Sequence, residues 1–148
     1  MIIDRPLNIR HAALEDLSPI AELLAQNALP YTDLIQSKVE LIVAYDQDMM
    51  MGCAGLQRYG QDALLRSVAV KRDFQKQGIG SILFDEVKVI AKTTGIDRIH
   101  LLTETAQDYW AAKGFKKTER SMAPENISSS SEFGNLCPSS AIYMVVEL

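Results

Sequence analysis

The chain has few cysteines, no long apolar run and no cluster of basic residues. Cys53 and Cys137 lack the spacing of metal ligands, and nothing suggests export, so we expect reduced thiols in a cytoplasmic protein without a metal. No apolar stretch approaches the ~18 residues that span a bilayer. The first ten residues carry Asp4 where a signal peptide has its apolar centre. We therefore expect neither a membrane protein nor a secreted one.

Charge is distributed along the chain rather than gathered in stripes. The formal net charge is −4 at pH 7, which argues against nucleic acid as the main partner. With 47% hydrophobic and 23% charged residues, the composition is that of an ordinary globular protein. The 148 residues suffice for one sizeable core, so we interpret residues 1–148 as a single domain.

Hydrophobic periodicity predicts an α+β chain, with three antiparallel strands before a series of strand–helix units. A first helix is expected to be capped by Asp16 and to end at Asn27. Gly52 and Gly55 indicate a bulge or close packing in the third strand. The other expected helices span 78–94 and 106–113, and the expected strands span 7–10, 39–45, 49–58, 63–70, 98–104, 115–119 and 141–148. Residues 121–138 form a polar excursion before the last strand.

The most informative stretch is the apolar strand that ends at Val70 and the loop that follows it. The loop reads Gln75-Lys76-Gln77-Gly78-Ile79-Gly80 and leads directly into an amphipathic helix. Glycines allow a close approach of the backbone. The first turn of a helix leaves N–H groups without intrahelical partners, and its dipole adds positive charge. The pattern therefore predicts an anion site, with a simple tight turn as the alternative.

The glycine spacing excludes two common phosphate loops. A Walker loop needs Gly-Lys-Ser/Thr, which is absent. A dinucleotide fingerprint needs three spaced glycines, whereas only Gly78 and Gly80 are present here. What remains is Q-x-x-G-x-G after a V-A-V strand.

The Q-x-x-G-x-G loop after the V-A-V strand resembles the acyl-coenzyme A (acyl-CoA) loop of the GNAT-type N-acetyltransferases. Two later segments strengthen the resemblance: the strand His100–Thr103, and Ala106-x-x-x-Trp110-x-x-x-Gly114-Phe115, which is similar to the family's A-x-x-x-Y-x-x-x-G-F. The resemblance covers residues 7–119. It implies a GNAT-like α+β fold with a mixed central β-sheet and helices on both faces. In such a fold, the strands 64–70 and 98–104 splay apart at the acyl-CoA site.

The resemblance implies acetyl-CoA-dependent transfer of an acetyl group directly to the amine of a small molecule. It places an oxyanion donor on a backbone amide near Val68 and the pyrophosphate on the loop amides. The implied cofactor-binding residues are Val68, Ala69, Val70, Gln75, Lys76, Gln77, Gly78, Ile79, Gly80, Ser81, Thr103 and Trp110. Two other functions stay open: an acyl-CoA-binding sensor with little catalysis, and a protein N-acetyltransferase. A homodimer also stays open, since family members are often dimers.

The chain departs from the family pattern at three positions. Trp110 stands where the family often has a tyrosine that protonates the leaving thiolate, and an indole N–H is not an acid at ordinary pH. Tyr109 is adjacent, but one residue rotates a helical side chain by ~100°. Tyr109, water and no general acid at all therefore remain open. Gln75 replaces a common arginine, and Thr103 a common asparagine.

A narrower resemblance concerns the acceptor. The segments 28–34, 63–70, 102–106 and 132–141 look like small acetyltransferases associated with arsenic-resistance clusters. Some relatives of that group acetylate the α-amine of amino-acid-like toxic compounds. The resemblance implies substrate contacts from Tyr31, Arg66 and Phe133, with Arg66 pairing with a carboxylate. Glu104, at the end of its strand, is the candidate base; the alternative for it is a surface carboxylate.

Overall fold

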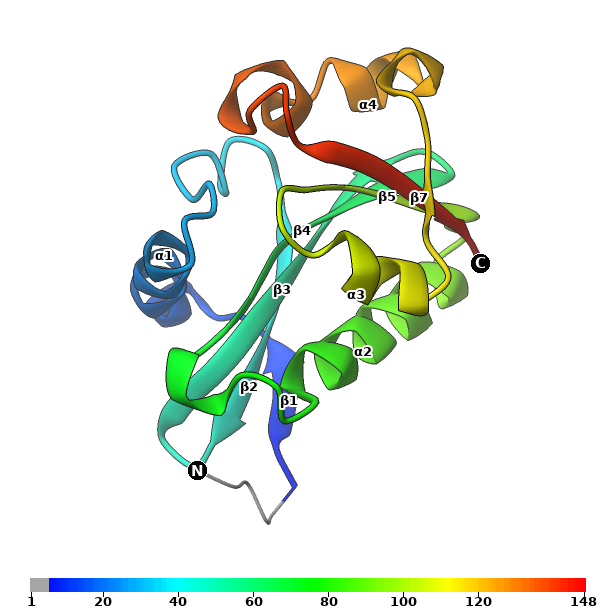
Figure 1. Cartoon of the computed structure of the whole chain (residues 1–148). Helices are drawn as coiled ribbons and strands as arrows, with labels where there is room; N and C mark the ends of the chain where they lie inside the picture. The colour runs from blue at the N-terminus through cyan, green and yellow to red at the C-terminus, as the bar shows by residue number, and fades with distance from the viewer. Residues whose placement is uncertain (1–5) are drawn as a thin grey trace.

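The computed structural model describes residues 6–148, so expectations for residues 1–5 lie outside the described part. Its centre is a seven-stranded sheet in the order β1-β2-β3-β4-β5-β7-β6 (Figure 1). Neighbouring strands are antiparallel except β4 and β5, which run parallel. The strands are β1 (Asn8–His11), β2 (Glu40–Asp46), β3 (Met49–Tyr59), β4 (Asp62–Val70), β5 (Arg98–Thr103), β6 (Lys116–Lys117) and β7 (Ile142–Glu147). The predicted mixed α+β sheet is confirmed.

Four α-helices accompany the sheet within residues 6–148. They are α1 (Leu17–Gln26), α2 (Ile79–Thr93), α3 (Gln107–Ala112) and α4 (Glu125–Ser128). Two expectations need correction. The strand expected at 115–119 shrinks to the two residues of β6, and the polar excursion at 121–138 contains α4 and a π-helical turn, Glu132–Leu136.

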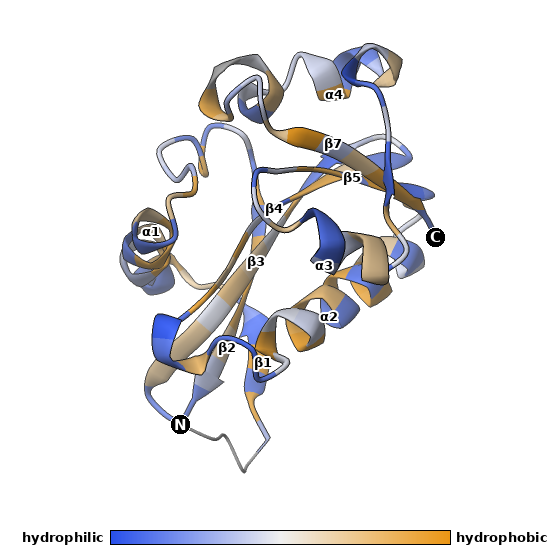
Figure 2. Cartoon of the chain, viewed as in Figure 1, coloured by the Kyte–Doolittle hydropathy of each residue, from blue (hydrophilic) through white to orange (hydrophobic). Residues whose placement is uncertain are grey.

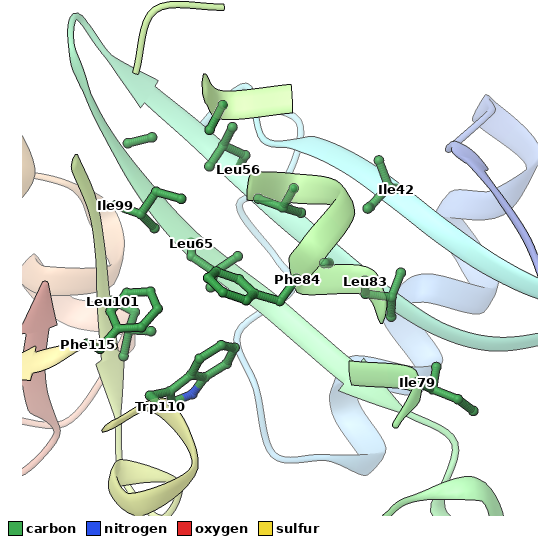
Figure 3. Close-up of a cluster of buried hydrophobic side chains, with 14 of the residues drawn as sticks. Ile42, Leu56, Leu65, Ile79, Leu83, Phe84, Ile99, Leu101, Trp110 and Phe115 are labelled. Carbon is green, nitrogen blue, oxygen red and sulfur yellow. The ribbon is translucent and has the colours of Figure 1, made fainter. Parts of the chain in front are cut away.

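The alternation of side chains along the strands divides the core between the two faces of the sheet. On β2, Ile42 packs in a cluster with α2, whereas its neighbour Val43 packs in a cluster with α1. Figure 2 shows that the middle strands are mainly apolar while the helices carry both apolar and polar residues. In Figure 3, Phe84 of α2 lies beside Leu65 of β4, and Trp110 of α3 lies close by. Helices therefore cover both faces, as the sequence predicts.

Strand β4 contains a bulge halfway along its length. The register of β3 against β4 shifts between Cys53 and Gly55, so Ser67 and Val68 together oppose Ala54. Ser67 has a φ of 62°, a left-handed conformation that residues other than glycine adopt infrequently. A bulge leaves one residue outside the hydrogen-bonded ladder and bends the strand. The bulge thus interrupts β4 shortly after Leu64, the last residue that pairs with the parallel strand β5.

The two glycines of β3 permit this bulge. A Cβ atom on Gly55 would lie 3.0 Å from the carbonyl oxygen of Arg66, and one on Gly52 would lie 2.8 Å from that of Ala69. Both distances fall below ordinary van der Waals contact, and carbonyl groups of the backbone cannot rotate away as a side chain does. The prediction of a bulge or close packing at these glycines is confirmed.

Strands β4 and β5 pair only near their beginnings. The paired residues run from Asp62 to Leu64 on β4 and from Arg98 to His100 on β5. Beyond these positions the two strands separate, as Figure 1 shows. The expected splay between the two parallel strands is confirmed, and it leaves two strand edges facing each other across an opening.

Asp16 is the N-cap residue of α1, as predicted, but the expected capping hydrogen bond of its side chain is wrong. Its carboxylate makes no side-chain bond to the first turn of α1. It accepts hydrogen bonds from Arg10 at 2.7 Å, from the hydroxyl of Tyr45 at 2.7 Å and from the backbone N–H of Ala13 at 2.6 Å. Asp16 therefore ties β1 and β2 to the entrance of α1.

Asp16→Asn is expected to lower the free energy of unfolding by about 2–3 kcal/mol at neutral pH, because hydrogen bonds to a charged group contribute about 1.5–3 kcal/mol. The hydrogen bond from Arg10 holds the pKa of Asp16 well below its usual value. A depressed pKa stabilises the fold above the pKa of the unfolded chain, about 4, and this contribution fades as the pH falls below it. Urea unfolding at neutral and acid pH measures both effects. The control is Glu22→Gln, on the exposed side of α1, and an Asp16 variant as stable as this control would contradict the account.

Candidate active site

A pocket of about 480 Å³ lies where β4 and β5 separate. Residues 65–68 of β4 form one wall, and residues 101–106, at and after the end of β5, form the other. The α1–β2 loop (27–39) and the segment 131–141, here called the closing segment, cover the pocket. The side chain of Trp110 on α3 also lines it. The pocket is therefore built from parts of the chain that the parallel pair holds apart.

A buried ion cluster supports the β4 wall of the pocket. The two terminal nitrogens of Arg66 donate to both carboxylate oxygens of Asp33, at 2.7 and 2.6 Å, and the arginine side chain is fully buried. Burial alone would raise the pKa of Asp33, but the hydrogen bonds from Arg66 and Ser37 hold it at about 2. Asp33 is thus a permanent anion at neutral pH and keeps Arg66 in place.

Asp33 also joins the two covering segments. Ser37 of the α1–β2 loop donates to its carboxylate at 2.6 Å, and Ser131 of the closing segment donates at 3.0 Å. The two hydroxyl oxygens lie 2.9 Å apart. One carboxylate therefore connects β4 with both segments that cover the pocket.

Glu132 lies at the start of the closing segment and lines the pocket. Its Oε1 atom is 4.0 Å from Nε of Arg66, and its side chain is 6% exposed. Burial raises the pKa of Glu132 to about 7, although the charge of Arg66 works in the opposite direction. Among the described residues, three buried polar side-chain atoms have no hydrogen-bond partner: Arg66 Nε, Ser67 Oγ and Glu132 Oε2. All three residues line this pocket.

The residues predicted to contact substrate are placed unequally. Arg66 and Glu104 line the pocket, but Asp33 already occupies the terminal nitrogens of Arg66. Tyr31 is 42% exposed and Phe133 packs against the ring of Tyr143, and neither is among the lining residues. The closing segment instead directs the neighbour of Phe133, Glu132, into the pocket. The sequence carried one signal for it: an acidic residue beside Phe133 in a serine-rich stretch.

The loop before α2, where the sequence predicts an anion site, is shaped by two glycines. Gly78 is the N-cap residue immediately before α2 and has a φ of 86°, a conformation that L side chains rarely adopt. A Cβ atom on Gly80 would meet the hydroxyl of Tyr109 at 3.3 Å. The first N–H groups of the helix have no intrahelical partner. Gly78 thus allows the left-handed backbone before the helix, and Gly80 leaves space beside Tyr109 at its first turn.

The side chain of Gln75 fastens this loop to the rest of the site. Its amide donates to the carbonyl oxygen of Val70 at 3.1 Å and to Asn27 at 3.2 Å. The end of β4 and the end of α1 are therefore linked at the start of the loop. Thr103, at the end of β5, lines the pocket and accepts a hydrogen bond from the backbone N–H of Ala106 at 3.0 Å.

Tyr109 and Trp110 serve different parts of the site. The hydroxyl of Tyr109 lies 3.0 Å from Oγ of Ser81, in the first turn of α2. Trp110 is buried, lines the pocket and packs edge-on against Phe84 and Phe115. Among residues 6–148, no cluster of His, Cys, Asp or Glu is placed to hold a metal ion, and no helix is long and apolar enough to cross a membrane.

Residues 37–117, more than half of the chain, match the family model of the acetyltransferase (GNAT) domain. The chain belongs to the GNAT family of acetyltransferases. An N-acetyltransferase of Chlorobaculum tepidum, itself uncharacterised, is 24% identical over 128 residues, which cover 80% of this chain and 81% of that protein. The amino-acid acetyltransferase of Proteus mirabilis is 23% identical over 133 residues.

The GNAT fold is also found in solved structures. N-acetylglutamate synthase from Neisseria gonorrhoeae, complexed with coenzyme A and N-acetyl-glutamate, superposes with a TM-score of 0.83 at 21% identity and covers 99% of this chain. This GNAT chain spans 36% of that synthase and 30% of the Proteus mirabilis relative. The reaction class that the family assigns to the chain is acetyl transfer, catalysed by an N-acetyltransferase.

Proposed function

We propose that this GNAT protein uses acetyl-CoA to acetylate the amine of a small, amino-acid-like molecule. The observation that carries the proposal is the pocket at the splay of β4 and β5, which adjoins the bulge and is walled by Glu132 and Arg66. Support also comes from relatives described as amino-acid acetyltransferases and from a neighbour bound to coenzyme A and N-acetyl-glutamate.

The residues present fit acetyl-CoA. A side chain on Gly80 would fill the space beside Tyr109, and the N-terminus of α2 offers unpaired N–H groups to a pyrophosphate. The free edge of β4 after the splay provides backbone groups for the extended pantetheine arm, which we assign to Val68, Ala69 and Val70. When bound, acetyl-CoA supplies the acetyl group as a thioester.

The bulge supports the assignment of a backbone donor for the developing oxyanion. It removes one of Ser67 and Val68 from the ladder with β3, and we assign the oxyanion contact to the N–H of Val68. A fixed backbone donor contributes most where charge develops, and removal of such a donor typically costs about 10²–10³ in rate. Ser67, the left-handed residue of the bulge, lines the pocket.

The dimensions of the pocket favour a small acceptor over a protein chain. A volume of about 480 Å³ lies in the range of small-molecule sites, about 300–1,000 Å³. The closing segment and the α1–β2 loop cover it and are joined through Asp33, whereas a peptide substrate needs an open groove. An acceptor carboxylate is expected to meet the Nε–H of Arg66, the one nitrogen of that guanidinium without a hydrogen-bond partner.

Release of the coenzyme A thiol, measured over a panel of amines, tests the proposed function. The panel pairs each amino acid or amino-acid analogue with the amine that lacks its carboxylate and includes short peptides, and acetyl-CoA binding is measured separately by calorimetric titration. We expect turnover with the carboxylated members and little with their partners. Turnover only with peptides would favour a protein acetyltransferase, and acetyl-CoA binding without turnover on any member would favour a sensor; either result contradicts the proposal.

Tyr109→Phe is expected to weaken acetyl-CoA binding by a factor of about 2–10 while the kcat at saturation stays within about twofold. The hydroxyl contacts Ser81 at the helix end rather than the pocket, and one neutral hydrogen bond contributes about 0.5–1.5 kcal/mol. Steady-state kinetics at saturating acceptor separate KM from kcat. A fall in kcat of more than about tenfold would instead identify Tyr109 as a general acid.

A further inference from the structure

Glu132 is the one carboxylate that enters the pocket from the closing segment while remaining almost fully buried. We propose that Glu132 binds the ammonium group of the acceptor and takes its proton, so that a neutral amine attacks the thioester. This assignment rests on the proposed function and deepens it, because it names the base and the charge that the acceptor must carry. It replaces Glu104 as the group that activates the amine.

The geometry around Glu132 leaves one oxygen for a ligand. Oε1 faces Nε of Arg66 at 4.0 Å, and the nearby thiol of Cys137 interacts electrostatically with the carboxylate. Oε2 is buried with no partner. A buried acceptor without a partner costs free energy, so a donor that enters the pocket recovers that cost. An ammonium group supplies both the donor and the opposite charge.

Two other buried polar atoms without a hydrogen-bond partner indicate a second charged group on the acceptor. Arg66 Nε–H is a buried donor and Ser67 Oγ is a hydroxyl, and neither has a partner. Both belong to residues that line the same pocket as Glu132. An ammonium on Glu132 and a carboxylate or similar oxyanion on Arg66 and Ser67 together satisfy all three atoms. The cluster therefore selects a zwitterion whose two charges lie close together.

Glu104 lines the same pocket but is exposed, at the end of β5. Glu132 differs in being buried, which raises its pKa and makes its carboxylate a better base. Glu104 remains the competing candidate that the sequence suggests. The two residues come from different segments, so separate variants distinguish them.

Several charged or titratable groups face Glu132. Arg66 approaches from β4, Asp33 from the α1–β2 loop, Cys137 from the closing segment and Tyr59 from the end of β3. Burial outweighs the attraction of Arg66 and sets the pKa of Glu132 at about 7. A base is most effective when its pKa lies near the working pH. Since only the carboxylate form accepts a proton, kcat/KM should rise with pH through about 7.

The proposed step balances as follows in atoms and charge. One proton moves from the ammonium nitrogen to the Glu132 carboxylate, which leaves a neutral amine. The nitrogen lone pair forms the C–N bond to the thioester carbon as the C–S bond breaks. A second N–H proton ends on the departing sulfur. The amide, free coenzyme A thiol and a protonated Glu132 result, and Glu132 returns its proton to solvent before the next cycle.

The test compares Glu132→Gln with Glu125→Gln, which lies on the exposed side of α4. We expect Glu132→Gln to lower kcat/KM for the acceptor by roughly 10²–10⁴-fold and to abolish its rise with pH near 7. Calorimetric titration should give an acetyl-CoA affinity within about twofold of the wild-type value, since the loop before α2 is untouched. Glu132→Asp should restore part of the rate, with a shifted pH profile. Glu125→Gln should resemble the wild type.

Two outcomes would overturn the assignment. One is a Glu132→Gln variant that keeps the wild-type rate and pH profile; the other is loss of the pH-dependent limb in Glu104→Gln instead. If Glu132→Gln does not fold, the wild-type profile and Glu132→Asp still decide, because a wild-type kcat/KM that is flat between about pH 6 and 8 excludes a base of this kind. Failure of the wild type to acetylate any amine would instead defeat the proposed function.

Discussion

Gly78→Val is expected to weaken acetyl-CoA binding by at least about 100-fold while the protein stays folded. Gly78 is the N-cap of α2 with a φ of 86°, and a β-branched residue is a severe outlier in that region. The chain relieves such strain, about 1–3 kcal/mol, by moving the loop. Movement of the loop would misalign the N–H groups that we assign to the pyrophosphate. Loss of two hydrogen bonds to a charged group, at about 1.5–3 kcal/mol each, accounts for the expected factor.

Gly95→Val is a matched control for this variant. Gly95 has a φ of 89°, and like Gly78 it has no atom within 4 Å of an added Cβ. It follows α2 at the opposite end from the loop. Both variants should lose similar thermal stability, and only Gly78→Val should lose acetyl-CoA binding in calorimetric titration. Equal affinities in the two variants would show that the loop does not hold the ligand.

Arg66→Met is expected to lower the free energy of unfolding by about 3–5 kcal/mol, because it leaves the buried carboxylate of Asp33 without its partner. It should also move the pH-dependent rise of kcat/KM to higher pH, since the charge of Arg66 lowers the pKa of Glu132. Urea unfolding measures the first effect and steady-state kinetics the second. The two effects have one cause, the single cation between two acidic side chains.

Arg58→Met provides the comparison on the neighbouring strand. Arg58 of β3 pairs with Glu40, but its side chain is 31% exposed, and such surface pairs contribute about 0–1 kcal/mol. The stability loss should therefore be several-fold smaller than for Arg66→Met. Equal losses in the two variants would mean that the Arg66–Asp33 pair contributes no more than a surface ion pair.

The parts of the fold that depend on local pattern could be predicted from the sequence. The apolar spacing of α2, the alternation in β2 and the close packing at Gly52 and Gly55 all follow from periods and residue types. Gly78 illustrates the same point, because its helix-starting conformation is one that only glycine adopts readily. Local rules do not give the length of β6, which pairs with the final strand of the sheet rather than with a sequence neighbour.

The ion cluster depended on contacts between distant parts of the chain. Arg66 on β4 meets Asp33 in a loop thirty-three residues earlier, and Glu132 in a segment far beyond it. No helical or strand periodicity connects these positions in the sequence. Glu132 lies at the start of a π-helical turn, which the local sequence pattern does not predict. Alternation on a strand predicts only the face on which Arg66 lies. Its partners are set by how the two covering segments fold back.

The environments of Tyr109 and Trp110 could be predicted only in part. A step of one residue on a helix predicts that the two side chains point in different directions. The structure identifies what each meets: Ser81 for Tyr109, and the pocket for Trp110. At the position that carries a tyrosine in much of the family, the indole of Trp110 therefore forms part of the pocket wall. The closest phenol lies beside the helix end instead.

Acetyl transfer to a zwitterionic amine is tested most directly by a calorimetric titration with acetyl-CoA, followed by addition of the amine. Acetyl-CoA is titrated into the purified protein to saturation, and an amino acid that gave turnover in the amine panel is then added while free thiol and product mass are followed. We predict saturable binding at one site per chain, then thiol release that matches the formation of N-acetylated product. Saturable binding with no thiol release, or release without acetylated amine, would contradict the account.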